Sequence, residues 1–278
     1  MAKKRYTRNE SDIQRLLSQG RGQGVGGNYS PYFFVRDVPS HGRSHRIYSR
    51  LSGRVIHLLS DIEYAHYLML DMDESVIDIR EQFALNRPDT IRIAANLGFR
   101  HPKDPKSDAN SVMTTDLVVT YQSRKTLPLK AIAIKPASEV GKARIAQKLK
   151  IEEMYWIERG IPFQVLTEQD IPNDLKRSLQ WLRPYQDFST LVEPSHGYFD
   201  KLARSLITCI HQANECGLGL AKMCAALDEQ FLYEQGPHLM IARHLLSTRL
   251  LQTDLNREQI WNTPASQIKV NPKLGLHW

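Results

Sequence analysis

The chain has 278 residues, of which 41% are hydrophobic and 24% charged, with a net charge of +7 at pH 7. These values are typical of a globular protein with about two domains and exclude a disordered chain. No apolar run approaches the roughly 18 residues of a membrane span, and the first residues are basic rather than apolar, so we expect an intracellular protein without membrane contact.

The net charge is concentrated at the N-terminus. Residues 1–50 hold ten lysines and arginines and three carboxylates, and ten minus three is the whole +7. A basic arm of this kind meets DNA phosphates in many proteins, although a solvated tail without a partner has the same composition. The glycines between 20 and 27 are typical of a flexible linker, or of a loop whose backbone N–H groups approach phosphate.

The next elements carry three polar residues that suit one site. A helix predicted over residues 60–70 has Glu63 in its first turn. Two apolar strands follow, with Asp116 near the start of the first and Lys135 at the end of the second. Two carboxylates suit a hard divalent cation, which activates water and neutralises charge on a phosphodiester, and a nearby lysine orients that water or the phosphate.

Each of these residues also has an ordinary structural interpretation. Ser60 and Glu63 form an S-x-x-E pattern, in which Glu63 bonds back to the start of its own helix. Asp116 at a strand start is typical of a turn or cap, and Lys135 before a proline is typical of a solvated strand end. The residues taken alone leave both interpretations open.

The remaining elements divide at about residue 170. Before it, further strands and helices are predicted near 54–59, 76–83, 84–113, 140–159 and 162–167. Their order predicts an α/β domain over residues 1–170, with a mixed sheet flanked by helices. After it, helical periodicity appears near 173–183, 199–214, 219–233 and 238–252, and a strand-like end lies near 266–270.

The second half therefore predicts a mainly α, winged-helix-like domain over residues 171–278. Its last predicted helix carries Arg243, His244 and Arg249. In a winged helix that binds DNA these side chains would face the duplex, whereas in one that binds protein they would form a solvated face.

Several stretches together resemble the TnsA family, the endonuclease subunits of heteromeric transposases of cut-and-paste transposons. They are residues 20–24, 42–49, 53–55, 58–61, 78–83, 115–116, 135–136, 155–156 and 161–162. The likeness covers about residues 20–170, and its most specific string is Gly-Arg-Ser-His-Arg-Ile at 42–47. The C-terminal part resembles the family in layout only.

The resemblance implies a restriction-endonuclease-like N-terminal domain and a winged-helix-like C-terminal domain. It assigns the catalytic acid to Glu63, the strand aspartate to Asp116 and the lysine to Lys135. It further implies Mg²⁺, with Mn²⁺ as a possible substitute, and hydrolysis of double-stranded DNA at the 5′ ends of a transposon. The implied partners are a TnsB-like transposase and a TnsC-like ATP-dependent regulator, and the implied location is the bacterial cytoplasm at the nucleoid.

One position departs from the pattern of this nuclease fold. Many such nucleases carry Glu, Asp or Gln two residues before the lysine, whereas this chain has Ala133. Metal binding would then use Glu63, Asp116, the backbone carbonyl of Ile134 and water. The departure favours an alternative, a non-catalytic DNA-binding adaptor with a degraded nuclease core; a stand-alone restriction or repair nuclease is a further alternative. For DNA contacts we expect four arginines: Arg21, Arg43, Arg46 and Arg80.

Overall fold

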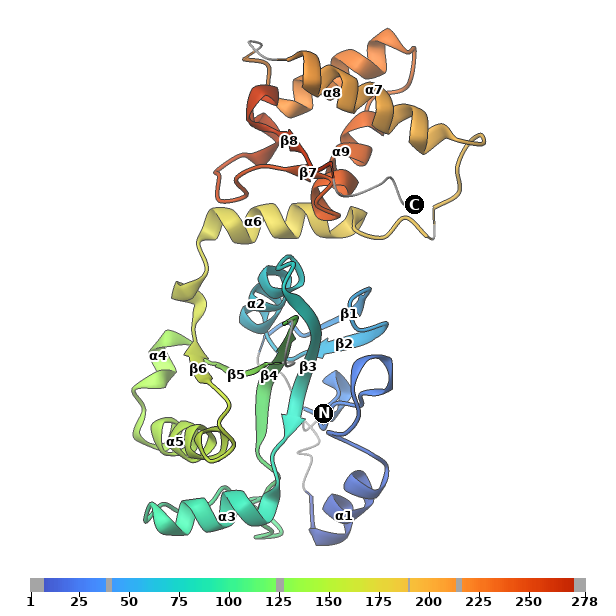
Figure 1. Cartoon of the computed structure of the whole chain (residues 1–278). Helices are drawn as coiled ribbons and strands as arrows, with labels where there is room; N and C mark the ends of the chain where they lie inside the picture. The colour runs from blue at the N-terminus through green and yellow to red at the C-terminus, as the bar shows by residue number, and fades with distance from the viewer. Residues whose placement is uncertain (1–7, 39–41, 124–127, 190, 214–216, 273–278) are drawn as a thin grey trace, which may run out of the picture. The chain divides into compact units, whose positions relative to one another are not determined.

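The computed structural model describes residues 8–38, 42–123, 128–189, 191–213 and 217–272 (Figure 1). The chain forms two compact units, Met1–Asp170 and Ile171–Trp278. Among the described residues, no helix combines the length and apolar character that a membrane crossing needs. Residues 1–7, which carry part of the predicted basic arm, lie outside the described residues.

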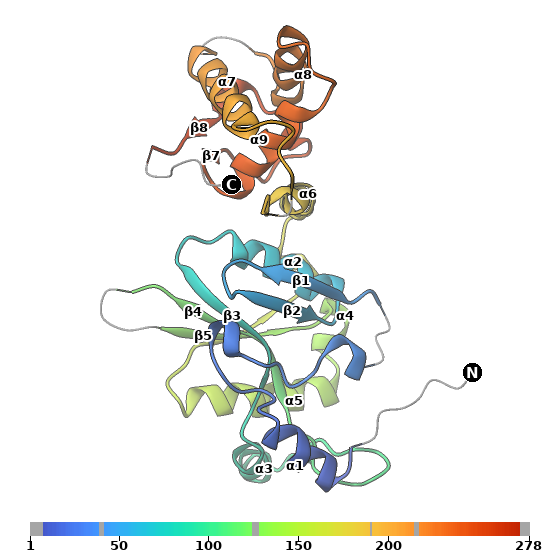
Figure 2. The ribbon, with the colours of Figure 1, turned by 90° about the vertical axis from the view of Figure 1, so that its right-hand side faces the viewer.

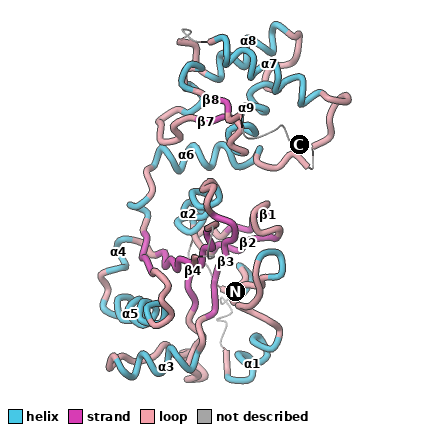
Figure 3. Tube along the Cα trace, in the orientation of Figure 1, coloured by secondary structure: helices cyan, strands magenta, loops and turns pink. Residues whose placement is uncertain are grey.

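The first unit is built on a mixed sheet of four strands. In sheet order these are β3 (Val76–Ala84), β4 (Thr114–Tyr121), β5 (Leu129–Ile134) and β6 (Phe163–Leu166). Strand β4 pairs antiparallel with both β3 and β5, whereas β6 runs parallel to β5. Figure 3 shows the strands in magenta. The centre of β4 is buried on both faces, as its nearly continuous apolar sequence requires.

Helices cover both faces of this sheet, as Figure 2 shows. They are α2 (Asp61–Asp71), α3 (Arg87–Asn96), α4 (Ala137–Val140) and α5 (Ala143–Ile157), preceded by α1 (Glu10–Ser18). Helix α5 packs Ile151, Tyr155 and Trp156 against the sheet residues Val118 and Ala131. Helix α2 lies on the opposite face, beside an antiparallel ribbon of β1 (His45–Ser49) and β2 (Arg54–Leu58). The mixed sheet flanked by helices is thus confirmed, although the helix expected over 140–159 is interrupted between α4 and α5.

The glycine-rich segment is part of the folded unit, so its interpretation as a flexible linker is wrong. Gln23 and Ser30 pair across the segment in a β-bridge. The backbone N–H of Gly26 donates to Oδ2 of Asp78 at 3.1 Å. Glycine is required at Gly22, because a Cβ atom there would lie 2.3 Å from the Cβ of Ala84 in β3.

The second unit is mainly helical. Its elements are α6 (Asn173–Leu182), α7 (Tyr198–Gln212), α8 (Leu220–Gln230), α9 (Pro237–Ser247), β7 (Leu251–Gln252) and β8 (Lys269–Val270). One apolar core joins α7, α8 and α9, and β7 pairs antiparallel with β8. Single 3-10 turns in the whole chain cover Gly26–Asn28, Val35–Asp37, Glu168–Asp170, Arg183–Tyr185, Ile260–Asn262 and Ala265–Gln267.

The last helix does not offer the DNA-facing residues that its sequence suggested. It ends at Ser247, before Arg249. The guanidinium of Arg243 donates through Nε to the carbonyl of Trp181 at 3.0 Å and stacks 3.9 Å from the ring centroid of Tyr185. His244 is buried, and its Nδ1 lies 2.7 Å from the carbonyl oxygen of Tyr185. Arg243 and His244 therefore hold the fold together and do not form a solvated face.

The close approach at Gly22 gives a testable prediction. Gly22 and Gly20 have φ angles of +74° and +77°, but only Gly22 has atoms of other residues within 4 Å of an added Cβ. A left-handed backbone alone costs alanine about 1–2 kcal/mol. Gly20→Ala should lower the free energy of unfolding by about that amount, and Gly22→Ala by roughly twice as much or more. Urea unfolding of both variants measures the difference; equal losses would show that the loop separates from β3 at little cost.

Candidate active site

The strand register brings the predicted site residues to one face of the sheet. Leu117 in β4 pairs with Ile132 in β5, so Asp116 is opposite Ala133 one step along the same register. Side chains two residues apart on a strand share a face. Lys135, two residues after Ala133, therefore points to the same side as Asp116 and meets it across the strand ends.

Asp116 is held by two donors from the neighbouring strand. Its Oδ2 atom accepts a hydrogen bond of 2.6 Å from the backbone N–H of Ile134 and another of 2.6 Å from Nζ of Lys135. The same ammonium also donates to the carbonyl of Ile134 at 3.0 Å. The carboxylate, the ammonium and the backbone carbonyl that we expected at one site therefore lie in direct contact. Asp116 is therefore not a turn or cap residue, and Lys135 is not a solvated strand end.

Glu63 is fixed in the first turn of α2. Ser60 caps the helix, because its Oγ accepts from the backbone N–H of Glu63 at 3.1 Å. The return bond differs from a capping box: Glu63 Oε2 accepts from the N–H of Leu59 at 2.9 Å, and Oε1 accepts from the Ser60 hydroxyl at 3.1 Å. Burial, followed by the negative charge of Asp116, raises the pKa of Glu63 to about 7. The two carboxylates are thus near enough for their charges to interact, and a shared site for them stays a prediction.

Lys135 remains protonated at neutral pH. Burial alone would lower its pKa, but the charges of Asp116, Glu152 and Glu63 and the hydrogen bond to Asp116 outweigh burial and raise it. A lysine with a raised pKa stays protonated, so it has no free lone pair with which to accept a proton. In this arrangement Lys135 supplies positive charge and hydrogen bonds rather than acting as a base.

Glu152 in α5 is a site residue that the sequence analysis missed. It is buried, its Oε1 accepts from the Thr115 hydroxyl at 2.7 Å, and Thr115 in turn accepts from Nε1 of Trp156 at 2.8 Å. Burial and the charge of Asp116 raise the pKa of Glu152 to about 8. The sequence could have shown this, because Glu152 lies on the same helix face as the apolar residues Leu149 and Trp156. A carboxylate on an apolar helix face is rarely buried without a partner or a function.

A cavity of about 300 Å³ opens beside these groups. Asp116, Lys135, Lys148 and Glu152 line it, together with residues of the 102–114 segment. The cavity opens the buried carboxylates of Asp116 and Glu152 to solvent, whereas Glu63 does not line it.

Gln82 in β3 is a second residue that the analysis missed. Its backbone has φ +46°, a conformation that a side chain other than Asn or Asp adopts only under constraint. Its carboxamide is buried; Nε2 lies 3.4 Å from Oε2 of Glu63, and Oε1 accepts from the Thr114 hydroxyl at 3.2 Å. Gln82 also stands next to Asp116 across the strands, on the side opposite Ala133. Ala133, on the β5 side of Asp116, offers no side-chain oxygen. On the β3 side of Asp116, Gln82 carries a carboxamide.

Two of the four arginines expected to contact DNA are buried within the fold. Arg21 is buried, and its Nη1 donates to Asp37 at 2.8 Å and to the carbonyl of Tyr32 at 3.2 Å. Arg80 is buried too, and its Nη2 donates to the Thr120 hydroxyl at 3.4 Å. A phosphate could reach either guanidinium only if these contacts were broken. DNA contact at Arg21 and Arg80 stays a prediction, which their burial in this structure does not favour.

Arg43 and Arg46 are exposed, as a DNA contact requires. The side chain of Arg43 is 82% exposed and lies 3.3 Å from Asp61 at the start of α2. Arg46 in β1 lines a cavity of about 460 Å³ with Arg36, His57 and two residues of the 34–35 segment. Burial, helped by the nearby arginines, lowers the pKa of His57 to about 4. This positive surface adjoins the helix that carries Glu63.

The residues at the sheet edge fit a hard divalent cation by their chemistry. The donors present are the carboxylates of Glu63 and Asp116 and the carbonyl of Ile134, all oxygen atoms, which is the ligand type that Mg²⁺ takes alongside several waters. Within the described part of the chain, no group of three or more His, Cys, Asp or Glu side chains is arranged as a metal site. A cation held by Glu63 and Asp116 would therefore need water and substrate oxygens to complete its ligands.

A mixed sheet that gathers acidic side chains and a lysine beside an open cavity is typical of nuclease domains. Similarity to known proteins identifies which nuclease family this is. The family described as "TnsA-like endonuclease N terminal" matches residues 73–168, and "TnsA endonuclease C terminal" matches residues 170–255. The Escherichia coli protein "Transposon Tn7 transposition protein TnsA" is 44% identical over 182 residues, which is 66% of this chain and 66% of that protein. The chain belongs to the TnsA family.

The match to the N-terminal family begins after Glu63, at residue 73. Asp116, Lys135 and Glu152 lie within it, whereas the assignment of Glu63 to the site is supported by its contacts and by its electrostatic interaction with Asp116.

The raised pKa of Glu152 predicts how stability depends on pH when no divalent cation is present. The carboxyl titrates near 4.5 ordinarily and at about 8 in the folded protein, so its burial stabilises the fold at low pH and loses that contribution as the pH rises through about 8. Glu152→Gln keeps the acceptor for Thr115 but cannot ionise. Its free energy of unfolding, relative to wild type, should therefore rise between pH 5 and pH 8, by up to a few kcal/mol, since one pKa unit is about 1.4 kcal/mol.

The measurement is urea unfolding at several pH values in a chelating buffer. Glu153→Gln, the exposed neighbour that pairs with Lys150 at 2.7 Å, is the control and should show no such trend. A flat difference for Glu152→Gln would mean that this carboxyl already ionises at low pH in the fold.

Proposed function

We propose that the protein is a divalent-metal-dependent DNA endonuclease subunit of a Tns-type transposase. The observation that carries the proposal is the contact at the strand ends, where Asp116 accepts from the ammonium of Lys135 and from the N–H of Ile134. The same ammonium also donates to the carbonyl of Ile134, and Glu63 is close enough for the charge of Asp116 to raise its pKa. Its substrate would be double-stranded DNA at the 5′ ends of a transposon, as the membership of the TnsA family supports.

In this proposal each side chain has a separate task. A Mg²⁺ ion held by Glu63 and Asp116 would supply an activated water and neutralise charge on the phosphodiester, and Mn²⁺ would be a substitute. The ammonium of Lys135 reaches the cavity, where it can donate to a phosphate oxygen or orient the attacking water. Glu152, at the cavity wall and with a pKa of about 8, holds a proton at neutral pH. The products would be a 5′ phosphate and a 3′ hydroxyl.

The DNA would lie over the ribbon of β1 and β2. The ribbon is fastened to the sheet by a buried ion pair, in which Arg54 Nη1 and Nη2 donate to Glu81 at 2.9 and 2.6 Å. Its outer face presents Arg46 and neutral His57 opposite each other, with Arg43 beside the start of α2. A rigid basic ribbon next to the helix of Glu63 would position the duplex backbone with respect to the carboxylates.

The second unit and the partners complete the proposal. We infer that α7, α8, α9 and the ribbon of β7 and β8 form a winged-helix-like domain. With Arg243 and His244 used in the fold, this domain is better suited to docking a protein than to reading DNA through α9. The partners would be a TnsB-like transposase that cuts the 3′ ends and a TnsC-like regulator that uses ATP, in the bacterial cytoplasm.

Replacing Asp116 tests the enzyme against the adaptor. Asp116→Ala and Asp116→Asn should abolish 5′-end cutting, because the metal loses a charged ligand and the developing charge on phosphorus loses its stabilisation. Assembly with TnsB-like and TnsC-like proteins should persist, and the product should change from simple insertion to a cointegrate. Strand-specific nicks and product class are the readouts, with exposed Asp108→Asn as control. Identical 5′ nicks in wild type and both Asp116 variants would assign the cutting to a partner.

Neutralising Arg43 and Arg46 tests the DNA surface. The double change to alanine should weaken DNA binding and lower the slope of log affinity against log salt by about 2, since each phosphate contact contributes close to one unit. The matched control removes two exposed cations elsewhere in the same unit, Arg92 in α3 and Lys150 in α5. An unchanged slope for the first variant, or an equal change in the control, would place the DNA on another surface.

A further inference from the structure

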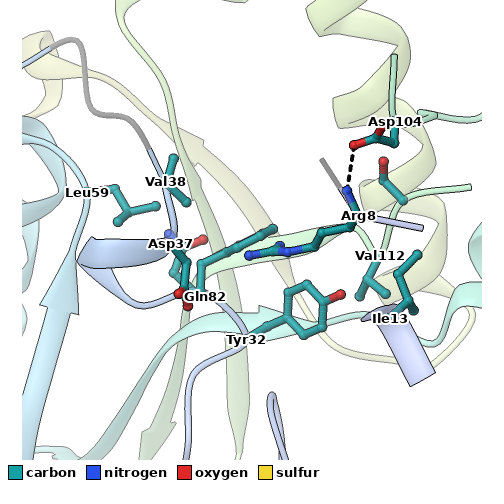
Figure 4. Close-up of a pocket in the computed structure, with 11 residues that line it drawn as sticks. Arg8, Ile13, Tyr32, Asp37, Val38, Leu59, Gln82, Asp104 and Val112 are labelled. Carbon is teal, nitrogen blue, oxygen red and sulfur yellow. Dashed lines mark hydrogen bonds between the residues drawn. The ribbon is translucent and has the colours of Figure 1, made fainter. Parts of the chain in front are cut away.

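A third cavity, of about 310 Å³, lies beside the acidic site (Figure 4). Two of its lining residues are bonded to the same oxygen of Glu63: the backbone N–H of Leu59 at 2.9 Å and Nε2 of Gln82 at 3.4 Å. The rest of the wall comes mainly from the N-terminal segment and from residues 104–112. The metal ligand proposed on α2 is thus only one contact away from this cavity.

Arg8 extends its guanidinium into the cavity, toward Gln82 and Asp37 in Figure 4. The group lies 4.4 Å from the ring centroid of Phe33 and 5.5 Å from that of Tyr32, so aromatic rings support it. Its backbone is fastened on both sides: the N–H donates to Asp104 at 3.0 Å, and the carbonyl accepts from the Ser107 hydroxyl at 2.7 Å. The side chain is therefore aimed by the fold.

No ion pair to Arg8 is found among the residues that the structure describes. The two carboxylates that line the cavity with Arg8, those of Asp37 and Asp104, accept hydrogen bonds from other donors. Asp37 Oδ2 accepts from Arg21 at 2.8 Å and from the N–H of Phe34 at 3.0 Å. Asp104 Oδ1 accepts from the N–H groups of residues 106 and 107, each at 2.9 Å. Within the described residues the guanidinium of Arg8 therefore faces the cavity without an ion pair of its own, and the carboxylates in the cavity wall are already held by other donors. Its N–H groups can donate to an anion that enters the cavity.

The cavity of Arg8 adjoins the cavity of Asp116 and Lys135. Ser111 and Val112 line both of them. Gln82, in the wall of the former, accepts a hydrogen bond of 3.2 Å from Thr114, in the wall of the latter. Neighbouring phosphates of one DNA strand could therefore reach the two cavities at the same time.

We propose that the Arg8 cavity receives the DNA phosphodiester next to the one that is cut, with Arg8 as its cation. The inference rests on the proposed nuclease function and adds a residue to it. A guanidinium suits a phosphate because it donates two parallel hydrogen bonds, which fix orientation as well as supplying charge. Arg8 would thereby set the position of the neighbouring phosphodiester over Glu63 and Asp116.

The experiment removes the negative charge from one phosphate at a time. Transposon-end duplexes carrying a single neutral methylphosphonate on either side of the cut are given to the protein assembled with its transposase partners. Single-turnover 5′ cleavage rates and equilibrium binding are measured for wild type, Arg8→Ala, Arg8→Lys and the control Arg15→Ala. Arg15 belongs to the same segment but pairs with Asp12 on the exposed side of α1.

Wild type should bind and cut about tenfold less well when the contacted phosphate is neutral, a typical loss for one charged hydrogen bond. Arg8→Ala should show the same loss on unmodified DNA and no further loss at that position. Arg8→Lys should lie between, and Arg15→Ala should match wild type. If Arg8→Ala keeps the wild-type profile at every position, the inference is wrong. If wild type does not cut at all, the proposed function fails, and the binding profiles still decide the role of Arg8.

Discussion

The site depends on one carboxylate, Asp116, that is held between two strand ends. Its contacts with the N–H of Ile134 and the ammonium of Lys135, both 2.6 Å, exist only because β4 and β5 pair in a single antiparallel register. A slip of one residue would turn Asp116 to the opposite face and separate it from Lys135. The buried apolar residues of β4 prevent that slip, so the packing of the sheet core and the geometry of the acidic site are the same constraint.

The second consequence is that buried acidic groups outnumber cations at the site, so some of these acids bind protons near neutral pH. Three buried or nearly buried acids, Glu63, Asp116 and Glu152, surround one ammonium, that of Lys135. The excess appears as raised pKa values, about 7 for Glu63 and about 8 for Glu152. Stability alone would favour apolar residues or further cations at these positions. A cluster of acids kept under this strain is favourable only where additional positive charge binds, as in the proposed metal-dependent cleavage.

Sequence patterns predicted the elements better than the partners of individual side chains. The S-x-x-E start of α2, the apolar strands and the change of pattern after residue 170 identified the sheet, its helices and the two halves of the chain, because these depend on local periodicity. Periodicity assigns a residue to one face of a helix or strand, but it does not show which residues of other elements that face contacts. Arg21 and Arg80 were therefore expected at a DNA surface and proved to be internal, and Glu152 and Gln82 escaped notice because their partners come from distant strands.

The basic N-terminal region shows why charge counting has this limit. In the fold its cations have different roles. Arg21 is paired with Asp37, whereas Arg43 and Arg46 are exposed on the surface and Arg8 points into a cavity. The segment is also bonded to the sheet through Gly26 and to the 104–107 turn through Arg8. The fold thus holds Arg8 at a fixed position in the cavity that adjoins the acidic site. Under the proposed function, binding of the DNA backbone and placement of the reacting phosphate would then be a single event rather than two.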